Sequence, residues 1–147
     1  MIQENKQLLL KDLSARLPYG VICKVEFKDM EGWKVQNMPL KGVFIDECYF
    51  STNKGSTYSK EFKPYLRPLS SMTEEERKEY NSFFGGIEPY DCDFSAYPIE
   101  YKYVYEWDIK NYIDFLNANH FDYRGLIPKG LAIEVTKENN PYEEINM

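Results

Sequence analysis

The chain contains few of the residues that carry most enzyme chemistry. It has one histidine, His120, and three cysteines, Cys23, Cys48 and Cys92, which lie far apart and form no CxxC pair. This spacing predicts neither a zinc site nor a disulfide framework, and it fits a reducing compartment such as the cytoplasm. Neither glycine-rich phosphate-loop pattern, GxGxxG or GxxxxGK followed by Ser or Thr, occurs in the sequence. No catalytic, cofactor or metal motif is therefore predicted.

Positive charge and long apolar runs are also scarce. Lys and Arg number 18 against 24 Asp and Glu, which gives a net charge of −6. Nucleic acids and anionic membrane surfaces attract proteins through clustered Lys and Arg, and no predicted helix carries a basic stripe. No segment approaches the roughly 18 apolar residues of a membrane span. We therefore expect no nucleic acid and no membrane as partner.

Tyrosine, by contrast, is abundant, with 13 residues among the 147. The stretch YPIEYKYVYEW, residues 97 to 107, alternates apolar and polar side chains, as a half-buried strand does. One face of such a strand would carry Tyr97, Ile99, Tyr101, Tyr103, Tyr105 and Trp107. We interpret this face mainly as core. Pro98 favours an edge position, so the exposed end could also serve as a contact surface.

The first half of the chain predicts one helix and several strands. Leucines spaced by three and four predict a helix over residues 4–17, which Pro18 and Gly20 end. Alternation predicts a strand over residues 21–27, a second strand in WKVQNM, and a more central strand over residues 40–50. Residues 51–60 read as a polar loop.

The second half predicts two helices and a last strand. Thr73 and Glu76 form a capping box that starts a helix ending near residues 85–86. Asp108 can cap a third helix, LAIEV at residues 131–135 reads as a strand, and residues 137–147 read as a loose tail. The order predicts a single α+β domain, residues 1–147, with a small antiparallel, curled sheet or partial barrel packed with about three helices.

Two arginines are candidates for binding an anion. Arg67 lies between two prolines and Arg124 lies in DYRG, so local chain stiffness would hold both guanidinium groups in place for a carboxylate or phosphate. The structural alternative is an ion pair with Asp122, or a carbonyl contact that pins the loop. With a small anionic ligand, the predicted contacts are Arg67, Arg124, Tyr65, Tyr101 and Tyr103.

His120 admits a catalytic and a structural interpretation. It could act as an acid or base with Asp122, or activate a cysteine such as Cys92. It also follows a predicted helix directly, where a histidine caps the last carbonyl groups.

Three segments of the chain carry a resemblance: LLLKDLSARLPYGVICKV at residues 8–25, KPYLRPLSSMTEEE at residues 63–76, and DFLNANHFDYRGLIPKGLAIEV at residues 114–135. Together they resemble a family of short proteins encoded by gut anaerobes and by their phages and mobile elements. No activity, ligand or catalytic residue comes with that family. The resemblance implies a bacterial or phage-infected cytoplasm and an accessory role.

Together these observations favour a non-catalytic binding module. Such a module would sequester a small anionic ligand or block a protein partner. The alternatives are a small enzyme that uses His120 with a cysteine or carboxylate, and a structural or assembly protein.

Overall fold

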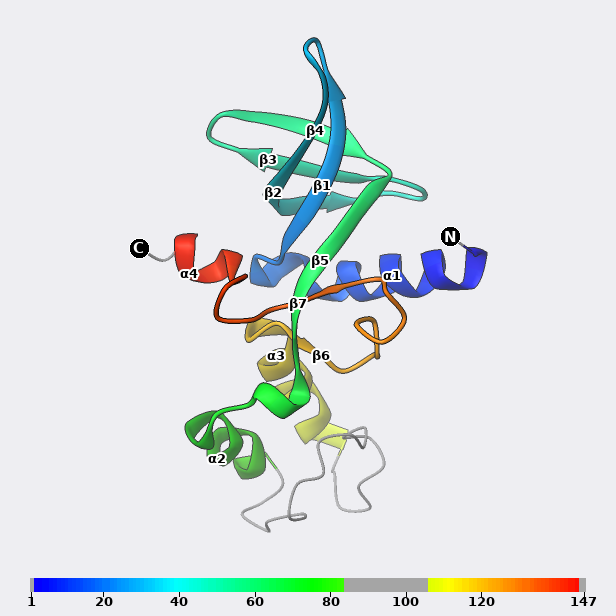
Figure 1. Cartoon of the computed structure of the whole chain (residues 1–147). Coiled ribbons are helices and arrows are strands. Elements are labelled where there is room, and N and C mark those ends of the chain that lie inside the picture. Colours follow the sequence, from blue (N-terminus) through cyan, green and yellow to red (C-terminus); the bar gives the residue numbers. More distant parts are fainter. Residues whose placement is uncertain (1, 84–105, 146–147) are drawn as a thin grey trace.

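The computed structural model describes residues 2–83 and 106–145 (Figure 1). In chain order the elements are α1 (Gln3–Arg16), η1 (Leu17–Tyr19), β1 (Ile22–Asp29), β2 (Gly32–Val43), β3 (Cys48–Thr52), β4 (Gly55–Ser59), β5 (Glu61–Pro68), η2 (Leu69–Ser71), α2 (Glu74–Ser82), α3 (Glu106–Ala118), β6 (Phe121–Asp122), β7 (Ile133–Glu134) and α4 (Pro141–Ile145). The predicted α+β class is confirmed.

The strands form one open, mixed sheet in the order β4-β3-β2-β1-β5-β6, with β7 also paired to β5. The first five strands pair antiparallel, as predicted, whereas the two-residue strands β6 and β7 lie parallel to β5. The long strand β2 changes partner along its length, from β1 to β3, and its register shifts between Leu40 and Gly42. A bulge of this kind bends a strand, so the sheet curls.

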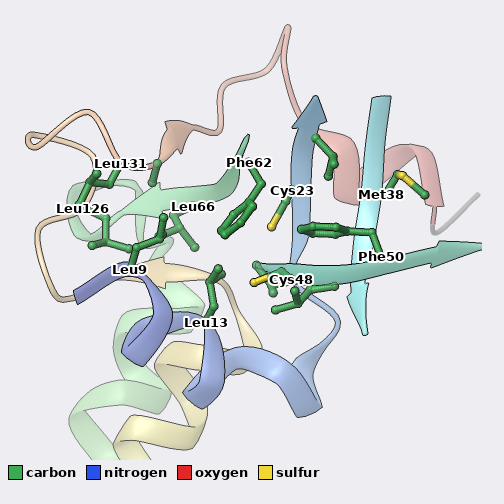
Figure 2. Close-up of a cluster of buried hydrophobic side chains, with 14 residues drawn as sticks. Leu9, Leu13, Cys23, Met38, Cys48, Phe50, Phe62, Leu66, Leu126 and Leu131 are labelled. Atoms are coloured by element: carbon green, nitrogen blue, oxygen red, sulfur yellow. The ribbon is translucent and has the colours of Figure 1, made fainter. Parts of the chain in front are cut away.

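Helix α1 lies across the curled sheet and closes its core (Figure 1). Leu9 and Leu13 share one helix face because they are four residues apart, and both are buried. Figure 2 shows Leu13 beside Cys48 of β3 and Leu9 beside Leu66 and Leu126, within the same buried cluster. The helix ends where predicted, since Pro18 follows and Gly20 adopts a left-handed φ of 71°.

A second buried cluster lies beyond α1, between α2, α3 and β6. Its members are Met72, Tyr80, Tyr112, Phe115, Leu116, Phe121 and Tyr123. The predicted capping box is confirmed: Thr73 accepts from the Glu76 backbone, and the Glu76 carboxylate accepts from the Thr73 backbone. Strand β5 runs from the sheet to α2 and so joins the two clusters (Figure 1).

Two strand predictions are wrong in detail. Residues 40–50 are not one central strand, because β2 ends at Val43, a turn follows, and β3 begins at Cys48. The backbone N–H of Phe44 donates to the Glu47 carbonyl across that turn, at 2.9 Å. Residues 51–60 are not a loop, because they form the end of β3, a tight connection and the edge strand β4. A polar edge strand lacks the apolar alternation on which the prediction relied.

The aromatic stretch lies almost wholly outside the described residues. Tyr97 to Tyr105 are not described, while the backbone at Trp107 belongs to α3 instead of a strand. This helix begins at Glu106, so Asp108 lies inside it and is not its cap.

The C-terminal segment differs from the predicted loose tail. Residues Pro141–Ile145 form α4, which lies near the start of β1 (Figure 1). The Tyr142 hydroxyl donates to the Tyr65 carbonyl at 2.6 Å and accepts from the Ile22 N–H at 3.1 Å. The hydroxyl group of Tyr142 thus connects this segment to β1 and β5.

Candidate functional site

A groove of about 1060 Å³ opens where the end of α3 meets the C-terminal segment. Its walls come from five separate parts of the chain: the connection between η1 and β1, the second half of β2, the stretch from β5 to α2, the end of α3, and residues 135–143. Side chains that line it include Lys41, Arg67, His120, Lys137 and Tyr142. Small-molecule sites usually have volumes of about 300 to 1000 Å³, so the groove is large enough for a metabolite.

His120 forms one wall of this groove and has a backbone conformation that is rare for its residue type. Its φ is 62°, the only positive value outside glycine among the described residues. The His120 N–H donates to the Asn117 carbonyl at 3.1 Å, and the His120 carbonyl accepts from Arg67 N–H at 2.8 Å. These bonds end α3 through the backbone of His120, whereas the sequence interpretation assigned the capping of the helix carbonyls to its side chain.

The His120 ring stacks on the Tyr142 ring. The ring centroids are 3.8 Å apart and the planes differ by 8°. Burial, followed by the positive charges of Arg16 and Arg67, lowers the pKa of His120 to about 4. The imidazole is therefore neutral at pH 7, and its buried Nδ1 atom has no hydrogen-bond partner among the described residues.

The described residues do not assemble a catalytic pair around His120. Both oxygens of Asp122 accept backbone N–H groups, from Leu126 and Ile127, at 2.9 Å. Cys23 and Cys48 are buried in the sheet core, where burial raises the pKa of both thiols, that of Cys48 to about 12. Such thiols are poor nucleophiles. The pairing of His120 with Cys92 concerns a residue outside the described part of the chain.

Arg67 lies in the groove wall, but its guanidinium group is already engaged. It makes two hydrogen bonds of 2.7 Å to the Glu76 carboxylate and lies 4.2 Å from the centroid of the Phe121 ring. A third bond, at 3.2 Å, reaches the Ser71 carbonyl. The pair is bidentate and holds the pKa of Glu76 below its usual value. Arg67 thus fixes the first turn of α2 against β5.

Arg124 lies elsewhere, at a buried ion cluster. It donates to Asp12 at 2.9 Å and to the Tyr123 hydroxyl at 3.1 Å, so its carboxylate partner is Asp12 and not Asp122. Asp12 also binds Arg16, which the one-turn spacing predicts, at 2.7 Å between Nε and Oδ2. Arg16 is fully buried and donates further to the Phe121 carbonyl at 2.6 Å. This cluster ties α1 to β6.

The predicted tyrosine contacts do not gather at the groove. Tyr65 is 4% exposed and donates to the Asn37 side chain at 2.7 Å. Its carbonyl group accepts a hydrogen bond from the Tyr142 hydroxyl, so Tyr65 holds a groove residue in place without lining the groove itself. Tyr101 and Tyr103 lie outside the described residues. Of the five predicted contacts, Arg67 is the one that the structure places in the groove wall.

Sequence reasoning missed three groove residues, Lys41, Lys137 and Tyr142. Lys41 lies at the irregularity in β2, and the other two lie in the segment predicted to be loose. None of them belongs to a motif. Together with Arg67, the two lysines bring three cations to the groove lining against the two carboxylates Glu76 and Glu143, and one of those carboxylates, Glu76, is paired with Arg67. The groove thus has an excess of positive charge in a chain of net charge −6.

The described residues hold no candidate metal cluster, and the chain has no significant similarity to known proteins. Within residues 2–83 and 106–145, no group of three or more His, Cys, Asp or Glu side chains could share a metal ion, and no helix is long and apolar enough to cross a membrane. No protein-family model matches the chain, and no curated protein or solved structure is significantly similar to it. The resemblance noted from the sequence therefore stays an expectation.

Proposed function

We propose that the protein is a non-catalytic binding module that holds a small anionic ligand in the groove beside His120. The observation that carries this proposal is the excess of positive charge in a groove of metabolite size, in a chain that is acidic as a whole. Charge of this kind raises the local concentration of anions and favours their capture.

The groove residues divide into binding groups and supporting groups. Lys41 and Lys137 are exposed, and neither ammonium group forms an ion pair with a described residue, so these groups are the proposed contacts for the anion. Arg67 positions the wall through Glu76 and adds its charge from a fixed place. The neutral His120 ring, stacked on Tyr142, offers a rigid side wall.

The contacts of His120 support binding over catalysis. A general base works best with a pKa near the working pH, whereas the pKa of His120 is about 4. The same neutral ring is well suited to a binding wall, because burial keeps it uncharged over the physiological range. An accessory role, in which the protein sequesters its ligand, is consistent with this arrangement.

Native mass spectrometry of the protein purified from cells that express it tests the proposal. We expect a stoichiometric small molecule that mild denaturation releases. The double variant K41E/K137E should lose it, since like charges repel an anion. The matched control is K24E/K63E, which makes the same charge change at two exposed lysines of the β1–β5 pair outside the groove.

A titration with inorganic phosphate supplies a second measurement. In NMR spectra, amide signals of Asn119, His120 and Thr136 should shift in the wild type and in K24E/K63E. The groove variant should bind at least about tenfold more weakly. A wild-type chain that is bare and shows no such shifts would refute the proposal, as would equal loss in both double variants.

A further inference from the structure

Strand β4 (Gly55–Ser59) has an edge to which no described strand is paired. It lies at one end of the sheet order and pairs only with β3. Its C-terminal end is tied down, because the Ser59 hydroxyl donates to the Glu26 carbonyl of β1 at 2.6 Å. The residues before Ser59 present an open backbone edge.

The pairing register shows which backbone groups this edge presents. Asn53 and Lys54 form a two-residue connection between Thr52 and Gly55. In such a hairpin, the two flanking residues form a hydrogen-bonded pair, in which each N–H group donates to the carbonyl group of the other residue. Hydrogen-bonded and open pairs then alternate along an antiparallel ladder. It follows that Gly55 and Thr57 direct their backbone groups at β3, whereas Ser56 and Tyr58 direct theirs away from it.

On one side of this edge lies an exposed aromatic cluster. The Tyr58 ring lies 4.8 Å from that of Tyr49 and 5.7 Å from that of Phe44, between ring centroids. Tyr58 is 56% exposed and Phe44 50%, and the neighbouring Ile45 is 94% exposed. A strand added to β4 would place alternate side chains over these rings.

The other side of the edge faces a hollow of about 270 Å³. Its lining includes Phe27 and Met38 from the β1–β2 hairpin and Thr57 from β4. The remaining side chains of an added strand would point into this hollow. Backbone groups, rings and hollow thus match the requirements of strand addition, in which the backbone supplies affinity and alternate pockets supply specificity.

The charges at the two ends of β4 indicate the partner. Lys54 precedes the strand and Lys60 follows it, both exposed, and the Lys60 contact with Asp46 spans 3.4 Å between exposed groups. Exposed pairs of this kind are weak, so they leave Lys60 accessible. In a second copy paired antiparallel, Lys54 would face Lys60 and repel it. A strand with acidic ends would be attracted at both.

We propose that the β4 edge binds an extended segment of another protein, with alternating apolar residues and an acidic residue at each end. This site is independent of the groove beside His120. It gives the protein a means of blocking a protein partner while a small ligand occupies the groove.

Peptide titration followed by NMR tests this proposal. The probe is a seven-residue synthetic peptide, with Asp at both ends and alternating Val and Thr between them, and the control peptide has Lys at both ends. We expect the Ser56 and Tyr58 amide signals to shift with the acidic peptide, which should bind at least about tenfold more tightly than the basic one.

Two variants separate this proposal from a general loss of folding. S56P removes an outward N–H group without removing a bond to β3, since proline is tolerated at sheet edges, and it should abolish binding. K54E/K60E should reverse the preference between the two peptides while leaving the fold intact. The proposal would be overturned if millimolar acidic peptide shifted neither the Ser56 nor the Tyr58 amide signal, or if S56P bound the peptide as tightly as the wild type. It would also be overturned if the wild-type chain formed a dimer that S56P converts to monomer.

Discussion

At the residue scale, His120 combines a positive φ, a buried ring nitrogen and a low pKa. Its φ of 62° lies in the left-handed region, where asparagine is among the least strained side chains after glycine. The substitution H120N therefore keeps the backbone and removes the titrating ring. It is a clean probe of how protonation of His120 affects stability, because the chain has no other histidine.

We predict that wild-type stability falls faster than that of H120N as the pH is lowered from 7 to 4.5. The pKa of His120 is about 4 in the folded state against 6.5 for the unfolded side chain, so the unfolded state binds more protons in this window. The stabilising effect is fully present above pH 6.5 and disappears as pH falls toward 4. Urea unfolding at both pH values should show an extra loss of about 1 to 2 kcal/mol, allowing for the ring's partial exposure.

Carboxylates titrate in both proteins and cancel in this comparison. The pKa of Glu76, for example, is below its usual value, so its protonation reduces stability mainly at a pH more acidic than the window for His120. Parallel pH profiles for the two proteins would show that His120 is as solvated in the folded state as in the unfolded chain.

At the scale of elements, a hydroxyl group joins α4 to the sheet. The Tyr142 hydroxyl binds backbone groups of β1 and β5, at Ile22 and Tyr65, next to the last pair of the ladder between those strands, Cys23 with Pro64. Without it, two backbone groups in the sheet lose their partner. Burial raises the pKa of this phenol, as expected for a hydroxyl removed from water.

We predict that Y142F destabilises the protein by about 2 kcal/mol, because an unsatisfied buried polar group costs roughly 1 to 3 kcal/mol. The ring and its stack on His120 remain in this variant. Urea denaturation at pH 7 measures the change, and Y58F, which removes the hydroxyl of an exposed tyrosine, is the control and should change stability by less than about 0.5 kcal/mol. Equal effects in the two variants would mean that α4 does not depend on this bond.

Elements with strong local signals could be predicted from the sequence, and those that depend on distant partners could not. Leucine spacing and Pro18 determine α1, and Thr73 with Glu76 determines the start of α2. The run over residues 40–50 is apolar on both faces, which hides the turn at residues 44–47. Strand β4 is polar because it lies at an edge, and only its pairing with β3 reveals it.

The groove was even less accessible to sequence reasoning. Its lining comes from residues 19–22, 39–41, 67–76, 118–120 and 135–143, and only the fold brings these segments together. Sequence isolated Arg67 and His120 as unusual residues, and both line the groove. The alternative role offered for Arg67 was an ion pair with Asp122 or a carbonyl contact; the ion pair forms with Glu76 instead of Asp122, and a carbonyl contact forms with Ser71.

At the scale of the whole molecule, two buried clusters are held together by polar bridges. One cluster lies between α1 and the sheet, and the other lies between α2, α3 and β6. Between them, Arg16 binds Asp12 and the Phe121 carbonyl while fully buried, and the Tyr19 hydroxyl donates to Asp114 of α3 at 2.6 Å. Buried ion pairs are costly to separate, because each charge would lose its compensation.

These bridges lead us to predict that the chain unfolds as a single cooperative unit. Substitution L13A removes a fully buried side chain from the sheet cluster and should cost about 2 to 5 kcal/mol. If the clusters are coupled, hydrogen exchange should show the same loss of protection at Val25 in β1 and at Leu116 in α3. The reciprocal substitution L116A, in the other cluster, should lower protection at Val25 in the same way. If Leu116 keeps its protection in L13A, the molecule contains two folding units. A cluster whose stability does not depend on the other cluster unfolds separately, even though polar bridges connect the two.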